Sequence, residues 1–232
     1  MGYHDVKTND DSEMEKPMIW LTNKFNRSPA ELVWANSKRW GPLNGQLLEL
    51  SYGMGHIFLN LYEKVQGQMQ GGQVRLPIPE FDTGVMRGRI NPANGQLYAA
   101  GMYAWAGNKH GPGNFHRVRY TGQPVYVPTA LRAVKSGLEI DFPVAIDADS
   151  VSPDAIEVKS WHIVRGSNYG SGHKDEQELV ISASTLSNDG KTLHLTIPDI
   201  APTRCMSIKA KPRTTDGHTF AFEINNTIHY LR

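Results

Sequence analysis

The stretch that decides the fold is LLELSYGMGHIFLNLY, residues 47–62. It contains two short apolar runs, residues 47–52 and 56–62, on either side of a glycine-rich turn at 53–55. Runs of this length and composition around a glycine turn are typical of two strands joined in a β-hairpin. The sequence therefore predicts a hairpin here, and the same pattern recurs along the chain.

The recurrence is clearest where Asn or Asp precedes Gly. Residues 85–90 lead into the turn NPANG at 91–95, and further strands are expected at 96–102 and 114–120. A second strong hairpin signal is SNDGKTLHLTI at 187–197. Asn-Gly and Asp-Gly pairs supply the positive φ that tight hairpins demand, so both stretches predict antiparallel strand pairs.

Helix signals are scarce. Only residues 28–34, where Pro29 and Glu31 follow Ser28 as a cap, predict one or two helical turns. The second half of the chain instead alternates apolar and polar residues, and seven strands are expected there, at 131–136, 137–142, 156–159, 178–181, 192–197, 206–210 and 219–223. We therefore assign the whole chain to the all-β class.

These elements divide the chain into three parts. Residues 1–17 are polar and weakly patterned, which predicts a flexible lead-in. Residues 18–127 contain two sets of strands, interpreted as about two blades of an incomplete β-propeller. Residues 128–232 hold about seven strands in about 105 residues, which indicates an immunoglobulin-like β-sandwich.

Composition excludes several classes of protein. The 232 residues are 39% apolar and 20% charged, and no apolar run is long enough for a spanning helix. A net charge of +1 lacks the basic excess of a dedicated nucleic-acid surface. Cys205 is the single cysteine, so neither an intramolecular disulfide nor a thiolate zinc site can form.

Three segments resemble the last blades of propellers related to the glucose and sorbosone dehydrogenases that use pyrroloquinoline quinone. They are GPLNGQL at 41–47, GQMQGG at 67–72 and TGVMRGR at 83–89. The chain is more similar still to large exported bacterial proteins that combine such a propeller with cytochrome-c-like or haem-binding modules. Residues 130–232 also resemble bacterial immunoglobulin-like modules, with DGKT at 189–192 in their usual hairpin.

This resemblance implies a fragment of an exported or periplasmic protein. The N-terminus has no apolar signal core, so we expect the signal to lie upstream. The first functional hypothesis is a non-catalytic terminal scaffold or accessory unit that packs against upstream propeller blades or a partner chain. The alternatives are the cofactor side of a sugar dehydrogenase that binds pyrroloquinoline quinone, and a carbohydrate-binding module.

Arg87 and Arg89, together with the nearby Asp82, are the first candidate ligand-binding residues. Two residues apart on a strand, their guanidinium groups face the same side and could bind a carboxylate or phosphate. Quinone-dependent propellers use a similar arginine pair to hold their cofactor, although the pair here lies closer to the following turn. The alternative is a structural role, with ion pairs to Asp82 or Glu80.

Three further candidates lie on loops or strands of less specific character. His110 belongs to a long glycine-rich loop at 105–114. Trp161 and Tyr169 could form a stacking platform for a glycan, although core packing is the commoner role of such residues. The glutamine-rich stretch at 66–73 predicts a flexible loop suited to sugar hydroxyls or to plain surface. Known catalytic motifs are absent from the sequence, so no catalytic residue is assigned.

Overall fold

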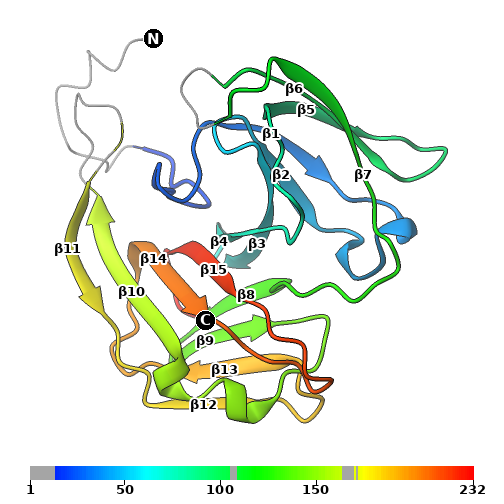
Figure 1. Ribbon diagram of the computed structural model, residues 1–232. Helices are drawn as coiled ribbons and strands as arrows, with labels where there is room; N and C mark the ends of the chain where they lie inside the picture. Colours follow the sequence, from blue (N-terminus) through cyan, green and yellow to red (C-terminus); the bar gives the residue numbers. More distant parts are fainter. Residues whose placement is uncertain (1–13, 105–108, 164–169, 171) are drawn as a thin grey trace.

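The computed structural model describes residues 14–104, 109–163, 170 and 172–232 (Figure 1). Strands account for 48% of the chain and helices for 6%, and none of the antiparallel sheets is closed within the described residues. The prediction of an all-β protein is therefore confirmed. The short 3₁₀ helices of the described part are η2 (Lys38–Leu43), η3 (Ala148–Ser150) and η4 (Pro153–Ala155).

The largest sheet has eight strands in the order β1-β2-β3-β4-β15-β14-β10-β11. Their bounds, in that order, are Pro29–Trp34, Leu47–Ser51, His56–Val65, Gln68–Arg75, Phe222–Ile228, Thr203–Ala210, Ile156–Ile163 and His173–Glu178. The pairing of β4 with β15 brings together strands from the two sides of Pro128. The eight-stranded sheet therefore contains strands from both sides of the predicted boundary near Pro128.

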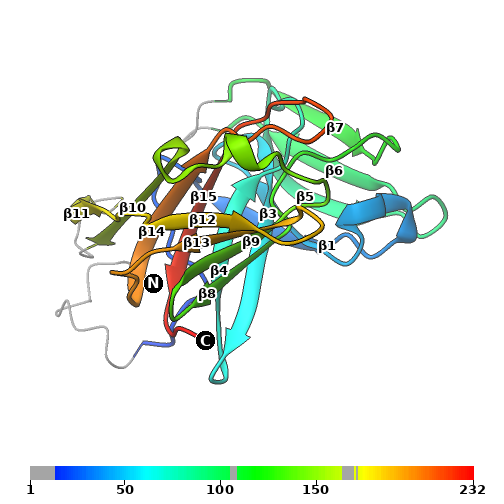
Figure 2. The same cartoon turned by 90° about the horizontal axis from the view of Figure 1, so that it is seen from below.

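Two smaller sheets cover one face of the large one (Figures 1 and 2). The four-stranded sheet has the order β12-β13-β9-β8, with bounds Ala183–Leu186, Thr192–Thr196, Gly137–Asp141 and Ala130–Val134. The three-stranded sheet has the order β5-β6-β7, with bounds Gly84–Ile90, Leu97–Met102 and Gly113–Val118. Buried side chains from all three sheets form a common hydrophobic core.

Alternation along β2 shows how the large sheet acquires two different faces. Leu48 and Leu50 are fully buried on the side of the core, whereas Glu49 lies on the opposite face, as the period of two requires. Gly88 lets the three-stranded sheet approach closely, because a Cβ there would lie 2.8 Å from Leu50 Cδ1 and 2.9 Å from Leu97 Cδ1. The large sheet thus has an apolar face under the small sheets and a polar face on its other side.

The prediction of helical turns at 28–34 is wrong. Residues 29–34 form the edge strand β1, whose residues pair with β2 from Glu31↔Leu50 to Trp34↔Leu47. Pro29 is the first residue of this strand, where its missing N–H costs no ladder hydrogen bond. Ser28 has φ +51° and turns the chain into the strand instead of capping a helix.

The predicted strand at 178–181 is also wrong. β11 ends at Glu178, and residues 179–182 lie outside a strand. The backbone N–H of Leu179 donates to Val158 O of the large sheet, while that of Ser182 already donates to Thr196 O of the four-stranded sheet. The chain crosses between two sheets here, so the apolar-polar alternation reflects a crossing segment.

Exposed apolar side chains concentrate in the first half of the chain. Six of the seven large ones among the described residues fall within residues 18–126: Leu32, Trp34, Tyr62, Met102, Tyr103 and Phe115; Val180 is the seventh.

Candidate functional site

The polar face of the eight-stranded sheet is divided by the segment 14–27, which crosses it. Trp20 N donates to Thr227 Oγ1 on β15 over 2.7 Å, and His229 Nε2 lies 2.8 Å from Pro17 O. Phe25 packs edge-on against Phe58 of β3, with 5.4 Å between ring centroids. We call the part beneath this segment the covered half, and the part over β10, β11 and β14 the open half.

Glu49 lies at the centre of the covered half and is 2% exposed. Its Oε2 accepts hydrogen bonds from Asn26 Nδ2 over 2.5 Å and from Gln73 Nε2 over 2.8 Å. Within the described structure its Oε1 has no hydrogen-bond partner. Burial raises the pKa of Glu49 to about 7, because the two amide donors only partly replace the hydration that the charged form loses.

The amides around Glu49 also satisfy one another. Asn26 Nδ2 lies 2.9 Å from Gln73 Oε1, and Ser51 Oγ donates to Asn26 Oδ1 over 2.7 Å. Gln73 Nε2 donates to Asn60 Oδ1 over 2.8 Å. The expectation of a flexible glutamine-rich loop at 66–73 is wrong, since residues 68–75 form β4 and Gln73 is buried. These contacts make the covered half a structural layer.

The open half is a groove of about 1090 Å³ bordered by β10, β11, β14, β15 and residues 22–25. Charged side chains are the largest group in its lining, and the two signs are equally represented. The five basic residues are Lys24, Arg75, Lys159, Lys209 and Lys211, and the five acidic ones are Asp154, Glu157, Glu176, Glu178 and Glu223. The formal charges of the groove therefore cancel.

Ion pairs organise part of this lining. Lys159 Nζ lies 2.9 Å from Glu157 Oε2, and Lys209 Nζ lies 3.6 Å from Glu157 Oε1. The hydrogen bond from Lys159 holds the pKa of Glu157 below its ordinary value. These side chains remain partly exposed, so solvent and a ligand can both reach them.

Trp161 lines the groove but does not present an exposed ring. It is 4% exposed and stacks on His173 of β11, with 4.2 Å between ring centroids and 16° between ring planes. The partner proposed for it in a stacking platform, Tyr169, lies outside the described residues. His173 Nδ1 lies 2.6 Å from Glu176 Oε2, and its side chain is 29% exposed. His173 therefore forms the accessible surface of this stack.

Arg87 and Arg89 both lie exposed on the outer face of β5, as their spacing predicts. Arg89 Nη1 pairs with Glu31 Oε1 on β1 over 2.5 Å, so its ion-pair partner is Glu31. The partners expected from the sequence are engaged elsewhere. Glu80 pairs with Arg75 and Lys109, while Asp82 is exposed and accepts a hydrogen bond from Gly111 N through its backbone carbonyl.

His110 is exposed beside Tyr103, with 5.9 Å between ring centroids. Part of its loop, residues 105–108, lies outside the described residues. Among the residues that are described, His, Cys, Asp and Glu side chains nowhere gather in threes that could hold a metal ion. None of the described helices is long and apolar enough to cross a membrane.

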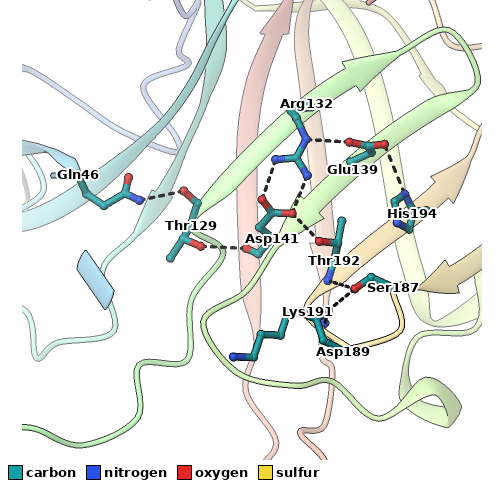
Figure 3. A network of polar contacts seen from close by, with 10 residues as sticks. All are labelled: Gln46, Thr129, Arg132, Glu139, Asp141, Ser187, Asp189, Lys191, Thr192 and His194. Atoms are coloured by element: carbon teal, nitrogen blue, oxygen red, sulfur yellow. Dashed lines mark hydrogen bonds and ion pairs between the residues drawn. The ribbon is translucent and has the colours of Figure 1, made fainter. Parts of the chain in front are cut away.

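A second polar network, on the four-stranded sheet, is structural (Figure 3). Arg132 binds both carboxylate oxygens of Asp141, over 2.6 and 2.7 Å, and its Nε donates to Glu139 over 2.7 Å. Thr192 Oγ1 donates to Asp141 as well, over 2.9 Å. The hydrogen bonds from Arg132 hold the pKa of Asp141 below its ordinary value. The network ties β8, β9 and β13 together and leaves little capacity for a ligand.

Sequence reasoning missed the groove and the layer around Glu49. The layer around Glu49 had one available signal in the sequence, which is a carboxylate within the apolar run at 47–50. A charged residue at such a position must be paired or hydrogen-bonded when it is buried. The groove residues come from segments separated by up to about 200 positions, from residue 22 to residue 225, and no local pattern joins them. Comparison with known proteins adds no relative: no family model, curated protein or solved structure matches the chain.

Proposed function

We propose that the chain is a non-catalytic accessory unit whose groove binds a neutral carbohydrate chain. The observation that carries this proposal is the open groove of about 1090 Å³, whose five basic and five acidic side chains cancel in charge. Small-molecule sites for apolar ligands are lined mainly by hydrophobic side chains, and this groove is not.

Hydrogen-bonding capacity favours a polyhydroxylated ligand. A carboxylate such as that of Glu157 only accepts hydrogen bonds, and an ammonium such as that of Lys159 only donates them. A hydroxyl does both, so a sugar chain can pair with either kind of group along the groove. A ligand of one charge would meet side chains of like charge in half of the charged residues of the lining, which costs binding energy.

The stack of His173 on Trp161 adds a flat, partly apolar surface to the groove. Aromatic rings of this kind pack against the C–H face of a sugar ring. Asn225 on β15 supplies an amide at the far side, where its Nδ2 donates to Glu223 Oε1 over 3.0 Å. The ligand would thus meet a stacking surface at one wall and hydrogen-bonding groups at the other.

We also propose that the chain comes from an exported protein, that residues 18–127 are propeller blades, and that residues 128–232 are an immunoglobulin-like sandwich. The antiparallel meander β5-β6-β7 and the pairing of β8, β9, β12 and β13 in a separate sheet are compatible with it. The pyrroloquinoline quinone alternative gains no support, because Arg87 and Arg89 lie exposed on an outer sheet face and Arg89 already pairs with Glu31.

Affinity electrophoresis tests carbohydrate binding directly. The full chain is run in native gels that contain a soluble neutral glucan, mannan or xylan, and at least one of these is expected to retard it. The double variant Lys159→Ala/Lys209→Ala should bind that polysaccharide at least about tenfold more weakly, since hydrogen bonds to charged groups contribute about 1.5–3 kcal/mol each.

The matched control is Lys135→Ala, which removes an exposed lysine from the β8–β9 turn, away from the groove. It should be retarded like the wild type. Absence of retardation in every neutral polysaccharide would overturn the proposal, and so would equal binding by the double variant and the control.

A further inference from the structure

The outer face of the three-stranded sheet carries a second, chemically different surface. Its outward positions hold Arg87 and Arg89 on β5, Tyr98 on β6, and Phe115 and Arg117 on β7. The outward positions of these three strands include no Lys, Asp or Glu. We call this set the arginine face, and its charge has a single sign.

The registers fix how these side chains are arranged. Arg89 and Arg117 both pair across Tyr98, so the row Arg89-Tyr98-Arg117 crosses all three strands, with about 10 Å between its outer Cα atoms. Arg87 lies two residues from Arg89, about 7 Å along the same strand. Three guanidinium groups are thus displayed from a rigid antiparallel sheet.

Two aromatic rings lie beside the arginines: Tyr98 stands between Arg89 and Arg117, and Phe115 follows in the neighbouring row. Phe115 is 67% exposed and stacks on Tyr98, with 5.7 Å between centroids and 23° between ring planes. Tyr98 is fixed in turn by Asn94 Nδ2, which donates to its hydroxyl over 3.0 Å. An exposed phenylalanine is costly unless something covers it, and its neighbours here are cations.

Part of the face already binds a carboxylate. Glu31 Oε1 accepts from Arg89 Nη1 over 2.5 Å, and its Oε2 accepts from Gly88 N over 2.6 Å. Arg117 has neither an ion pair nor a side-chain hydrogen bond to any described residue, and Arg87 donates only to its neighbour's carbonyl, Met86 O, over 3.0 Å. Two guanidinium groups therefore keep their capacity for anions.

We infer that the arginine face binds an acidic polysaccharide, a sugar chain that bears carboxylates. Arginine presents a planar fork that binds a carboxylate through two parallel hydrogen bonds, which lysine cannot do. The sugar rings between the carboxylates pack against Phe115 and Tyr98. The net charge of +1 favours this ligand over a nucleic acid, which is held by a larger basic excess. This site is independent of the groove proposed for neutral carbohydrate.

Binding of the full chain to immobilised polygalacturonate tests this inference. The double variant Arg87→Gln/Arg117→Gln should lose at least tenfold in affinity, and Phe115→Ala about threefold or more. Arg117→Lys keeps the charge but loses the planar fork, so it should weaken binding severalfold. Lys135→Gln removes an equal charge from another sheet and should bind like the wild type.

Two results would overturn the inference. One is equal binding of polygalacturonate by the wild type and the double arginine variant, with circular dichroism showing both to be folded. The other is tighter binding of a single-stranded oligonucleotide than of polygalacturonate, which would assign the face to nucleic acid. If the double arginine variant loses polygalacturonate binding but is still retarded by a neutral polysaccharide like the wild type, the arginine face and the groove are separate sites.

Discussion

The covered half and the open half of the polar sheet face belong to the same eight strands, yet they hold different side chains. Beneath the segment 14–27 the face carries the amides of Gln73 and Asn60 beside a single carboxylate, that of Glu49, and Asn26 of the covering segment donates to that carboxylate. Over β10, β11 and β14 it carries lysines and glutamates in nearly equal number. The strand period places polar residues in both halves, and burial then determines which polar residues are tolerated.

Desolvation explains the difference. A charge in the groove stays partly hydrated, and the side chains of Lys159 and Glu157 are 31% and 37% exposed, so this ion pair needs little further compensation. An amide is cheaper to bury than a charge, provided that its donors and acceptors are paired. Glu49 is the exception in the covered half, and its raised pKa is the consequence.

The largest effect expected from this contrast is a pH dependence of the free energy of unfolding that is caused by Glu49. Its pKa is about 7 in the folded chain against an ordinary value of 4.5. Because folding favours the protonated form, the stabilisation is fully present below pH 4.5 and is lost as the pH rises to about 7. The difference of pKa corresponds to roughly 3 kcal/mol.

Urea denaturation of the wild type and Glu49→Gln between pH 4.5 and pH 8 measures this effect. The variant should gain roughly 3 kcal/mol relative to the wild type over that range. Taking the difference matters, because burial lowers the pKa of His56 and so gives a slope of opposite sign in both proteins. A difference that stays constant with pH would show that Glu49 is ionised in the folded chain.

The next effect is a difference in the loss of unfolding free energy between a substitution in the covered half and one in the open half. Asn26→Ala leaves Gln73 Oε1 and part of Glu49 without a buried donor, so the free energy of unfolding should fall by about 2 kcal/mol. Lys209→Ala, in the open half, should change it by less than about 0.5 kcal/mol. Equal losses in the two variants, measured by urea denaturation, would remove the distinction between the halves.

The smallest effect concerns how firmly the segment 14–27 lies on the sheet. Cys205 is 1% exposed, its Sγ lies 3.8 Å from Trp20 O, and burial raises the pKa of its thiol to about 12. Native protein should therefore react slowly with a thiol reagent at pH 8, because the thiolate is the nucleophile. Trp20→Ala should raise the labelling rate about tenfold.

A wild-type labelling rate equal to that of the urea-unfolded chain would mean that Cys205 is not protected. Labelling of Trp20→Ala at the wild-type rate would show that another part of the structure protects it. Either outcome would contradict the assignment of the segment 14–27 as a stable cover.

The all-β class and most strand positions could be predicted, because hairpins leave local signals. The hairpin at 47–62 and the turn at 91–95 lie where their turn residues place them. Predictions failed where a local pattern was compatible with two kinds of secondary structure. Pro29 and Glu31 suit a helix start as well as an edge strand, and only the pairing of β1 with β2 distinguishes the two.

The candidate residues divide in the same way. The common orientation of Arg87 and Arg89 follows from the strand period alone, and the structure agrees. Their companions Phe115 and Arg117 lie almost 30 residues further along the chain, and the pairing of β6 with β7 brings them to the same face. Trp161 was a reasonable candidate by type, but its burial against His173 could not be read from sequence.

Local sequence was enough to place the alternating strands and the turns, since these depend on neighbours within a few positions, and the count of one cysteine excluded an intramolecular disulfide. The tertiary structure decided which polar face is covered and which is open. It did so by pairing β4 with β15 across 150 positions and by laying the segment 14–27 over the result. Hydration is lost or kept only when distant segments meet, so burial sets both the pKa of Glu49 and the openness of the groove.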